Sequence, residues 1–149
     1  MNKIGFTAGT FDMFHVGHLN LIKKAKENCD YLIVGVNSKK LVESYKKKSP
    51  LIPEEDRLEI VRAIKYVDEV HMMDSLDKVK AYKLYGFSTV FIGDDYKDSP
   101  RYKKTEQNLK EYNVNIEYLP YTEKVSSTIL SKKIIHNELN KKFYNLDKV

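Results

Sequence analysis

The chain has 149 residues, of which 42% are hydrophobic and 32% charged, a composition typical of one globular domain and not of a disordered chain. No apolar run approaches the roughly 20 residues that cross a bilayer, and the segment after Met1 lacks a signal-peptide pattern. The single cysteine, Cys29, excludes an internal disulfide. We therefore expect a cytoplasmic protein with no membrane partner.

The net charge of +5 raises the question of nucleic-acid binding. The excess is almost entirely lysine, since only Arg57, Arg62 and Arg101 are arginines, and the basic residues are interleaved with 21 acidic ones. This distribution indicates a solvated surface with one focused phosphate site. We do not expect a nucleic-acid partner.

Apolar spacing and turn residues predict strands and helices that alternate along the chain. The run 31–36 is unbroken and apolar, as in a strand covered on both faces, and Pro53 followed by three acidic residues is a helix start. The expected strands are 3–8, 31–36, 67–72, 88–92 and 115–119, and the expected helices are 17–27, 38–45, 53–64, 77–85, 105–112 and 126–139.

Such alternation requires crossover helices, so we expect an α/β fold: a single Rossmann-like domain with a five-stranded parallel sheet and helices on both faces. We assign residues 1–140 to this domain and expect the tail 141–149 to fray. Ligands of such sheets bind at the carboxyl ends of the strands.

The loop after the first strand carries His15 and His18 at the start of a helix, with Gly17 between them. A helix N-terminus attracts anions, and two imidazole donors beside it suit a phosphorus centre under attack. The alternative is a helix cap and a packing residue. Metal ligation lacks a third ligand at a suitable spacing, so we expect no metal site.

Three further segments are weak signals when taken alone. The run Lys46–Lys48 is usually a solvated loop, Gly93–Asp95 a turn, and Ser126–Thr128 a helix cap. All of them nevertheless fall near predicted strand ends, where a phosphate ligand would bind.

Gly9–Asp12 together with His15–His18 resembles the signature of the cytidylyltransferase-like nucleotidyltransferase superfamily. Residues 46–57, 66–70, 93–96 and 122–128 are similar to its later motifs in the same order. Within the superfamily, the chain looks most like the bacterial glycerol-3-phosphate cytidylyltransferases.

The resemblance implies transfer of CMP from CTP, carried with Mg²⁺, to a small phosphorylated alcohol, in a homodimer that serves cell-wall or capsule synthesis. It implies catalytic roles for His15, His18 and Lys46, and acceptor binding by Asp12, Lys46 and Lys78. The nucleotide-binding residues it implies are Gly9, Thr10, Phe11, Gly17, Lys48, Gly93, Asp94, Thr122, Ser126, Ser127 and Thr128.

The chain departs from that pattern at two arginine positions, where it has Lys65 and Tyr121. Tyrosine does not supply the cationic fork that arginine presents to phosphate. Three alternatives therefore stay open: cytidylyl transfer to another phosphorylated alcohol (ethanolamine phosphate, choline phosphate or a polyol phosphate); adenylyl transfer from ATP to such an acceptor; and a nucleotide-binding regulator without catalysis.

Overall fold

The computed structural model describes residues 2–120 and 127–146 and confirms the alternating order of strands and helices. A short 3-10 turn, η1, follows the fourth strand. The elements are β1 (Ile4–Gly9), α1 (Val16–Glu27), β2 (Tyr31–Asn37), α2 (Lys39–Tyr45), α3 (Glu54–Arg62), β3 (Glu69–Met73), α4 (Lys78–Tyr85), β4 (Thr89–Gly93), η1 (Asp94–Tyr96), α5 (Pro100–Lys110), β5 (Asn115–Leu119) and α6 (Ser127–Leu146).

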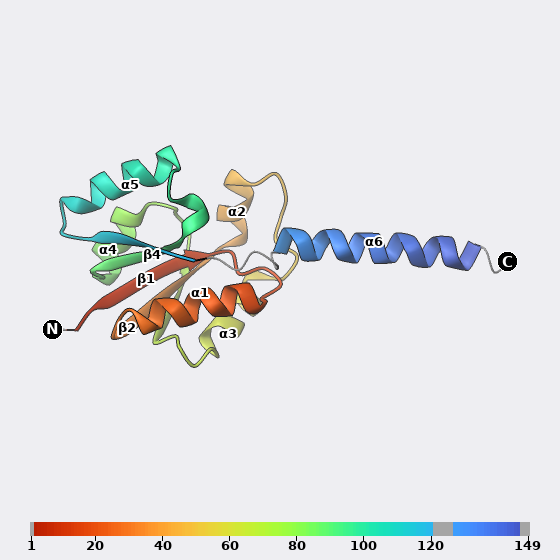
Figure 1. The fold of residues 1–149 in the computed structure, drawn as a ribbon, viewed down its shortest axis with the longest axis horizontal. Coiled ribbons are helices and arrows are strands. Elements are labelled where there is room, and N and C mark those ends of the chain that lie inside the picture. The colour runs from red at the N-terminus through yellow and green to blue at the C-terminus, as the bar shows by residue number, and fades with distance from the viewer. Residues whose placement is uncertain (1, 121–126, 147–149) are drawn as a thin grey trace.

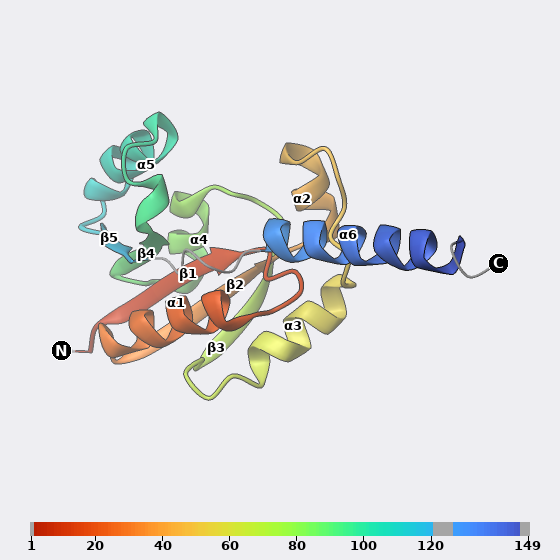
Figure 2. The same ribbon diagram turned by 45° about the vertical axis from the view of Figure 1, so that its right-hand side comes forward.

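The five strands form one parallel sheet in the order β3-β2-β1-β4-β5. β1 lies at its centre, with Phe6 opposite Ile33 of β2 and Val90 of β4. From β1 the chain first adds β2 and β3 on one side of the sheet and then returns to add β4 and β5 on the other. The loops after β1 and β4 therefore diverge to opposite sides. This is the switch point at which open α/β sheets bind ligands. The Rossmann-like fold expected from the sequence is thus confirmed (Figures 1 and 2).

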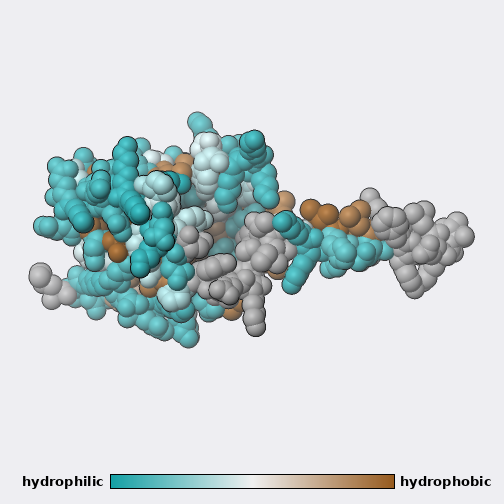
Figure 3. Space-filling view, turned by 45° about the horizontal axis from the view of Figure 1, so that its top comes forward, coloured by the Kyte–Doolittle hydropathy of each residue, from teal (hydrophilic) through white to brown (hydrophobic). Residues whose placement is uncertain are grey.

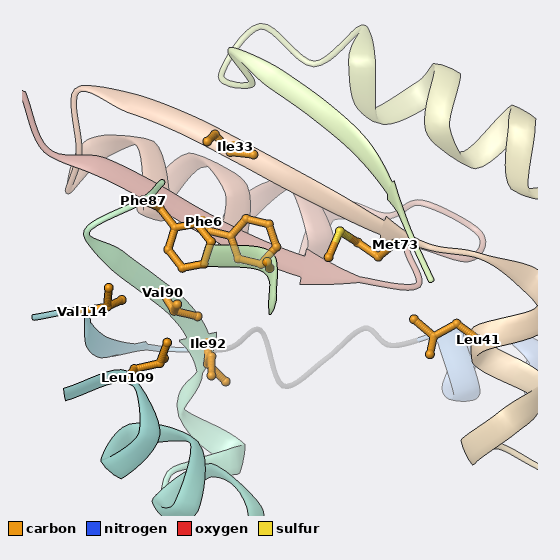
Figure 4. Close-up of a cluster of buried hydrophobic side chains, with 10 residues drawn as sticks. Phe6, Ile33, Leu41, Met73, Phe87, Val90, Ile92, Leu109 and Val114 are labelled. Atoms are coloured by element: carbon orange, nitrogen blue, oxygen red, sulfur yellow. The ribbon is translucent and has the colours of Figure 1, made fainter. Parts of the chain in front are cut away.

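Each face of the sheet packs against its own set of helices. On one face, Leu41 of α2, Ala81 of α4 and Leu109 of α5 belong to one buried cluster with Phe6 and Phe87. The rings of Phe6 and Phe87 stack 4.6 Å apart (Figure 4). On the other face, Ile22 and Ala25 of α1 and Val61 of α3 cover β2. These side chains are fully buried, so both faces of the central strands lose contact with water.

Two helices differ from the expected boundaries. The helix predicted over 105–112 is α5, which begins five residues earlier at Pro100 and ends at Lys110. Proline fixes φ and has no N–H to leave unpaired, so it is favoured in the first turn of a helix. The final helix, expected to end near Leu139, continues to Leu146.

The final helix, α6, projects away from the body of the molecule in both ribbon views (Figures 1 and 2). In the space-filling view its apolar side chains form a brown strip along one side (Figure 3), and Ile134, Ile135 and Leu139 are 52%, 61% and 48% exposed. Despite its 20 residues, neither α6 nor any other helix in the described part of the chain combines the length and apolarity that a membrane span requires.

Candidate active site

A cavity of about 310 Å³ opens at the carboxyl ends of the strands. Its walls come from the loop after β1, the first half of α1, the end of β2, α2 and the segment after it, η1, the first turns of α4 and α5, and the second turn of α6. It therefore lies where the sequence predicted the ligand. The lining residues are Ala8, Gly9, Thr10, Phe11, Asp12, His18, Leu21, Asn37, Val42, Tyr45, Lys46, Lys48, Ser49, Pro50, Leu76, Lys78, Tyr96, Arg101, Tyr102 and Ser131.

The two histidines of the first loop form a stacked pair at the start of α1. Their ring centroids are 3.8 Å apart and the rings are inclined by 25°. His15 is the N-cap of α1, and its Nδ1 accepts a 3.0 Å hydrogen bond from the Gly17 N–H. The Nδ1 of His18 accepts in return from the His15 N–H at 3.2 Å. The capping interpretation of this motif is therefore correct, and it is the capping that orients both rings.

These two hydrogen bonds determine where each imidazole carries its proton. Because each Nδ1 accepts a backbone N–H, the neutral rings are protonated on Nε2. Burial lowers the pKa of His15, and burial followed by the charge of His15 lowers the pKa of His18 to about 4. Both rings are therefore neutral near pH 7 and offer Nε2–H donors.

His18 lines the cavity, whereas His15 lies stacked against it. The Nε2 of His15 is buried and has no hydrogen-bond partner among the described residues. A buried donor without a protein partner is costly in a folded protein, so this N–H is available to an ordered water or to a ligand atom that reaches it.

Asp12 and Arg57 join the first loop to the segment that precedes α3. The carboxylate of Asp12 accepts hydrogen bonds of 2.9 Å from the N–H groups of Leu51 and Ile52. Asp12 lines the cavity, so this contact ties the segment after the lysine run directly to the site.

Arg57 is 1% exposed and holds three backbone carbonyls around the cavity. Its Nη1 donates to the carbonyls of Thr10 and Asn37, each at 2.7 Å, and its Nε donates to that of Ile52 at 3.0 Å. The guanidinium therefore fixes the ends of β1 and β2 relative to each other. Arg57 was not identified as a site residue from sequence, although its spacing with Val61 places it on the buried face of α3.

Tyr45, the last residue of α2, connects the same two strand ends. Its hydroxyl lies 3.3 Å from the Thr10 Oγ1 and accepts a 3.1 Å hydrogen bond from the Asn37 Nδ2. The Nζ of the next residue, Lys46, lies 5.9 Å from the centroid of the Tyr45 ring. Asn37 and Tyr45 were likewise missed by sequence reasoning.

Four cationic side chains line the cavity: Lys46, Lys48, Lys78 and Arg101. The structure thus brings together three lysines from two separate segments of the sequence, all three of which were expected at the site. Arg101 was not expected there, because the helix that carries it was predicted to begin only at residue 105. A run of cations in one cavity favours a polyanionic ligand such as a nucleoside triphosphate.

The remaining predicted residues fall into three groups. Gly17 is in the first turn of α1, Gly93 ends β4 and Asp94 begins η1, and none of the three is among the cavity-lining residues. Ser127 and Thr128 begin α6, but their side chains lie outside the described residues, as do Thr122 and Ser126. Ser131 of α6 lines the cavity, so the start of this helix is at the site.

No group of three or more His, Cys, Asp or Glu that could hold a metal ion occurs within the described residues.

The switch-point cavity, its cations and the paired N–H donors define an α/β protein that binds a phosphorylated nucleotide. Residues 6–133 match the cytidylyltransferase-like family, and the chain belongs to that family. It is a nucleotidyltransferase.

Named relatives within this family differ in substrate. The chain is 36% identical over 133 residues to the glycerol-3-phosphate cytidylyltransferase of Bacillus spizizenii, an alignment that covers 89% of this chain and 96% of the relative. It is 35% identical over 130 residues to the FAD synthase of Thermococcus kodakarensis, an alignment that covers 85% of each chain. Sequence similarity thus shows the reaction class and leaves the nucleotide and the acceptor open.

Among solved structures, the chain resembles the lipopolysaccharide core biosynthesis protein from Thermoplasma volcanium GSS1. The TM-score is 0.69 at 20% identity, and the match covers 82% of this chain and 98% of that one. At this level of identity the likeness concerns the fold alone.

Proposed function

We propose that the protein transfers CMP from CTP to glycerol 3-phosphate and releases pyrophosphate. The observation that carries nucleotidyl transfer is the stacked pair of neutral histidines, of which His18 lines the cation-lined cavity and His15 lies directly against His18. Cytosolic CTP and a phosphorylated alcohol are then the substrates, and the product is CDP-glycerol.

In this reaction an oxygen of the acceptor phosphate attacks the α-phosphorus of CTP. A new P–O bond forms as the bond between the α-phosphorus and the α,β-bridging oxygen breaks, and the electron pair leaves with pyrophosphate. No covalent enzyme intermediate is needed, so positioning and charge stabilisation provide the catalysis. The Nε2–H groups of His15 and His18 would donate to the α-phosphate oxygens, where negative charge grows in the transition state.

Lys46 and Lys48 would neutralise the phosphates of CTP from the segment after α2. Thr10 and Phe11 would contact the nucleotide, and the first turn of α6 would face the β- and γ-phosphates. Magnesium enters with CTP as part of the substrate, because the triphosphate oxygens are hard ligands that this ion prefers.

A small acceptor is favoured by the relative named glycerol-3-phosphate cytidylyltransferase, which matches over nearly its whole length.

A second candidate is adenylyl transfer from ATP to FMN. It is favoured by the relatives named FAD synthase and by the rings of Tyr96 and Tyr102, which lie 5.4 Å apart beside the cavity and offer an aromatic surface for a flavin. The two candidates differ in both nucleotide and acceptor, so one experiment separates them.

The test is pyrophosphate release over a matrix of the four nucleoside triphosphates with glycerol 3-phosphate, ethanolamine phosphate, choline phosphate and FMN. We expect turnover with CTP and glycerol 3-phosphate. His18→Ala should lower kcat by about 10²- to 10³-fold, the loss usual for one transition-state donor. His136→Ala, which removes an exposed histidine of α6, is the matched control and should leave kcat unchanged.

Turnover only with ATP and FMN would replace the substrates and keep the histidine mechanism. An unchanged kcat in His18→Ala would contradict the mechanism itself. CTP binding without turnover on any acceptor would support the non-catalytic regulator.

We propose in addition that two copies pair through the side of the sheet that carries the loop after β1. Light scattering of the eluted protein tests this pairing, and a mass of 17.4 kDa at all concentrations would contradict it.

A further inference from the structure

Two of the cavity cations lie apart from the lysine run after α2 and come from different helices. Lys78 is the first residue of α4, and Arg101 is the second residue of α5. Both line the cavity, and the charge of Arg101 is among the causes that lower the pKa of Lys78, so the two charges are close enough to interact. In the described part of the chain neither forms an ion pair with a carboxylate.

The surroundings of Lys78 make an uncompensated charge costly. Its Nζ lies 5.8 Å from the centroid of the Phe6 ring, which is fully buried in the core. Burial is the largest cause and the charge of Arg101 the second, and together they lower the pKa of Lys78 to about 8, although Asp77 acts in the opposite direction. The carboxylate of Asp77 is itself engaged, because it caps α4 by accepting from the N–H groups of Val79 and Lys80. Two cations in this position are stabilised by an anion placed between them.

The guanidinium of Arg101 is held against an aromatic surface. Its central carbon lies 5.4 Å from the centroid of the Tyr102 ring, and the Tyr102 ring lies 5.4 Å from that of Tyr96 at an angle of 47°. A guanidinium that rests on a ring face keeps its plane and presents its edge N–H groups to one side. Such an edge matches two oxygens of a phosphate, a match that an ammonium does not provide.

The family resemblance already implies that Lys78 binds the acceptor; we propose that Arg101 joins it in holding the acceptor's terminal phosphate and makes the site select a phosphomonoester dianion over less charged acceptors. This inference rests on the proposed nucleotidyl transfer. Lys46 and Lys48 then act from the segment after α2, and the phosphate that attacks the α-phosphorus is also held from the walls formed by α4 and α5. The tyrosines beside Arg101 face the carbon part of the acceptor.

Steady-state kinetics of Arg101→Ala test this assignment. We expect the KM for glycerol 3-phosphate to rise about 10- to 100-fold, in line with the loss of hydrogen bonds to a charged group, while the KM for CTP stays within about twofold. Arg101→Lys keeps the charge without the planar edge and should recover only part of the loss. Lys104→Ala removes an exposed charge from the same helix outside the cavity and should change neither constant.

An unchanged KM for glycerol 3-phosphate in Arg101→Ala would overturn the proposal, as would an equal rise in the KM for CTP. The same kinetic result in Lys104→Ala would reduce the effect to general electrostatics and would also overturn it.

Direct binding separates a failure of this proposal from a failure of the proposed function. Calorimetric titration with inorganic phosphate, on protein saturated with a non-hydrolysable CTP analogue, needs no turnover. If the wild type binds phosphate and Arg101→Ala binds it at least tenfold more weakly, the anion site is supported even where glycerol 3-phosphate is not turned over. If both bind phosphate equally, the site is refuted even where CDP-glycerol is made.

Discussion

The loop after β1 holds two residues other than glycine in the left-handed backbone region. Phe11 has φ of 53° and Met13 has φ of 47°, and residues with side chains rarely adopt such values. Phe11 is 4% exposed, and its ring meets that of His18 edge to face at 5.4 Å. Packing of the Phe11 ring thus supports the strained backbone and adds a contact to the His18 ring, which the capping hydrogen bonds already orient. Strain of this kind is concentrated at functional sites.

The lowered pKa of His18 predicts how stability depends on pH. The pKa is about 4 in the folded protein, whereas a histidine exposed to water in an unfolded chain has its ordinary value of 6.5. Between these values the unfolded state binds more protons, so the free energy of unfolding falls as pH drops through this window and is unaffected by His18 above it. In His18→Gln this fall should be shallower, by up to about 1.4 kcal/mol per pH unit. Urea unfolding at several pH values from about 7.5 to about 4.5, chosen to span the titration of an unfolded histidine, measures the difference.

His15, whose pKa is also lowered, contributes to the remaining slope in the same direction. His136→Gln, at an exposed position on α6, is the matched control and should keep the slope of the wild type. Identical slopes in the wild type and His18→Gln would show that the imidazole of His18 is not desolvated in the folded protein.

At the residue scale, sequence identified the side chains that belong to one local motif. His15 and His18 lie within one turn. Because a strand was predicted directly before them, the sequence placed them at the carboxyl edge of the sheet. Arg57 could not be assigned in this way, because its role depends on carbonyls of Thr10 and Asn37 that reach it only through the packing of α3 against β2. Tyr45 and Asn37 likewise meet through a bend in the chain that composition does not encode.

At the scale of elements, the strands were predicted closely because their apolar runs are continuous and bounded by turns. The error at α5 arose because Pro53 was recognised as a start signal and Pro100 was not, although both prolines stand at a helix start. The consequence concerned the site: a helix predicted to begin at residue 105 leaves Arg101 outside it, and a cation that lines the cavity was missed.

Close approach of β1 to a neighbouring side chain makes Gly5 sensitive to any added atom. A Cβ at Gly5 would lie 2.4 Å from the Cε2 of Phe91 and 3.0 Å from the Sγ of Cys29. Phe91 is 1% exposed, so its ring has little room to move. Gly5→Ala should therefore lower the free energy of unfolding by about 1–3 kcal/mol, as measured by urea unfolding.

A double-mutant cycle identifies the cause. Phe91→Leu removes ring atoms from the point of contact, so the alanine should cost less in that background than in the wild type. Additive costs would show that the loss comes from the flexibility or pairing of β1 and not from the clash with Phe91.

At the scale of the whole molecule, the sheet and the helices α1 to α5 form a body to which α6 is attached at the cavity. Ser131 lines the cavity, but residues 132–140 are all exposed (Figure 3). Movement of α6 relative to the body would therefore displace the wall that Ser131 provides and change the cavity entrance. We therefore expect nucleotide binding to stabilise the start of the helix.

Isolated helices of this length are marginally stable in water, because most helical stability in proteins comes from packing. The amides of residues 132–140 should therefore exchange with solvent within seconds to minutes, whereas those of β1 and β2 should exchange only with global unfolding. Hydrogen exchange followed by mass spectrometry, with and without CTP, measures both. We expect CTP to slow exchange in the first turns of α6 and to leave the outer turns unaffected. Protection of the outer turns equal to that of the sheet would contradict this view, and a dependence of that protection on protein concentration would show that a second copy covers the helix.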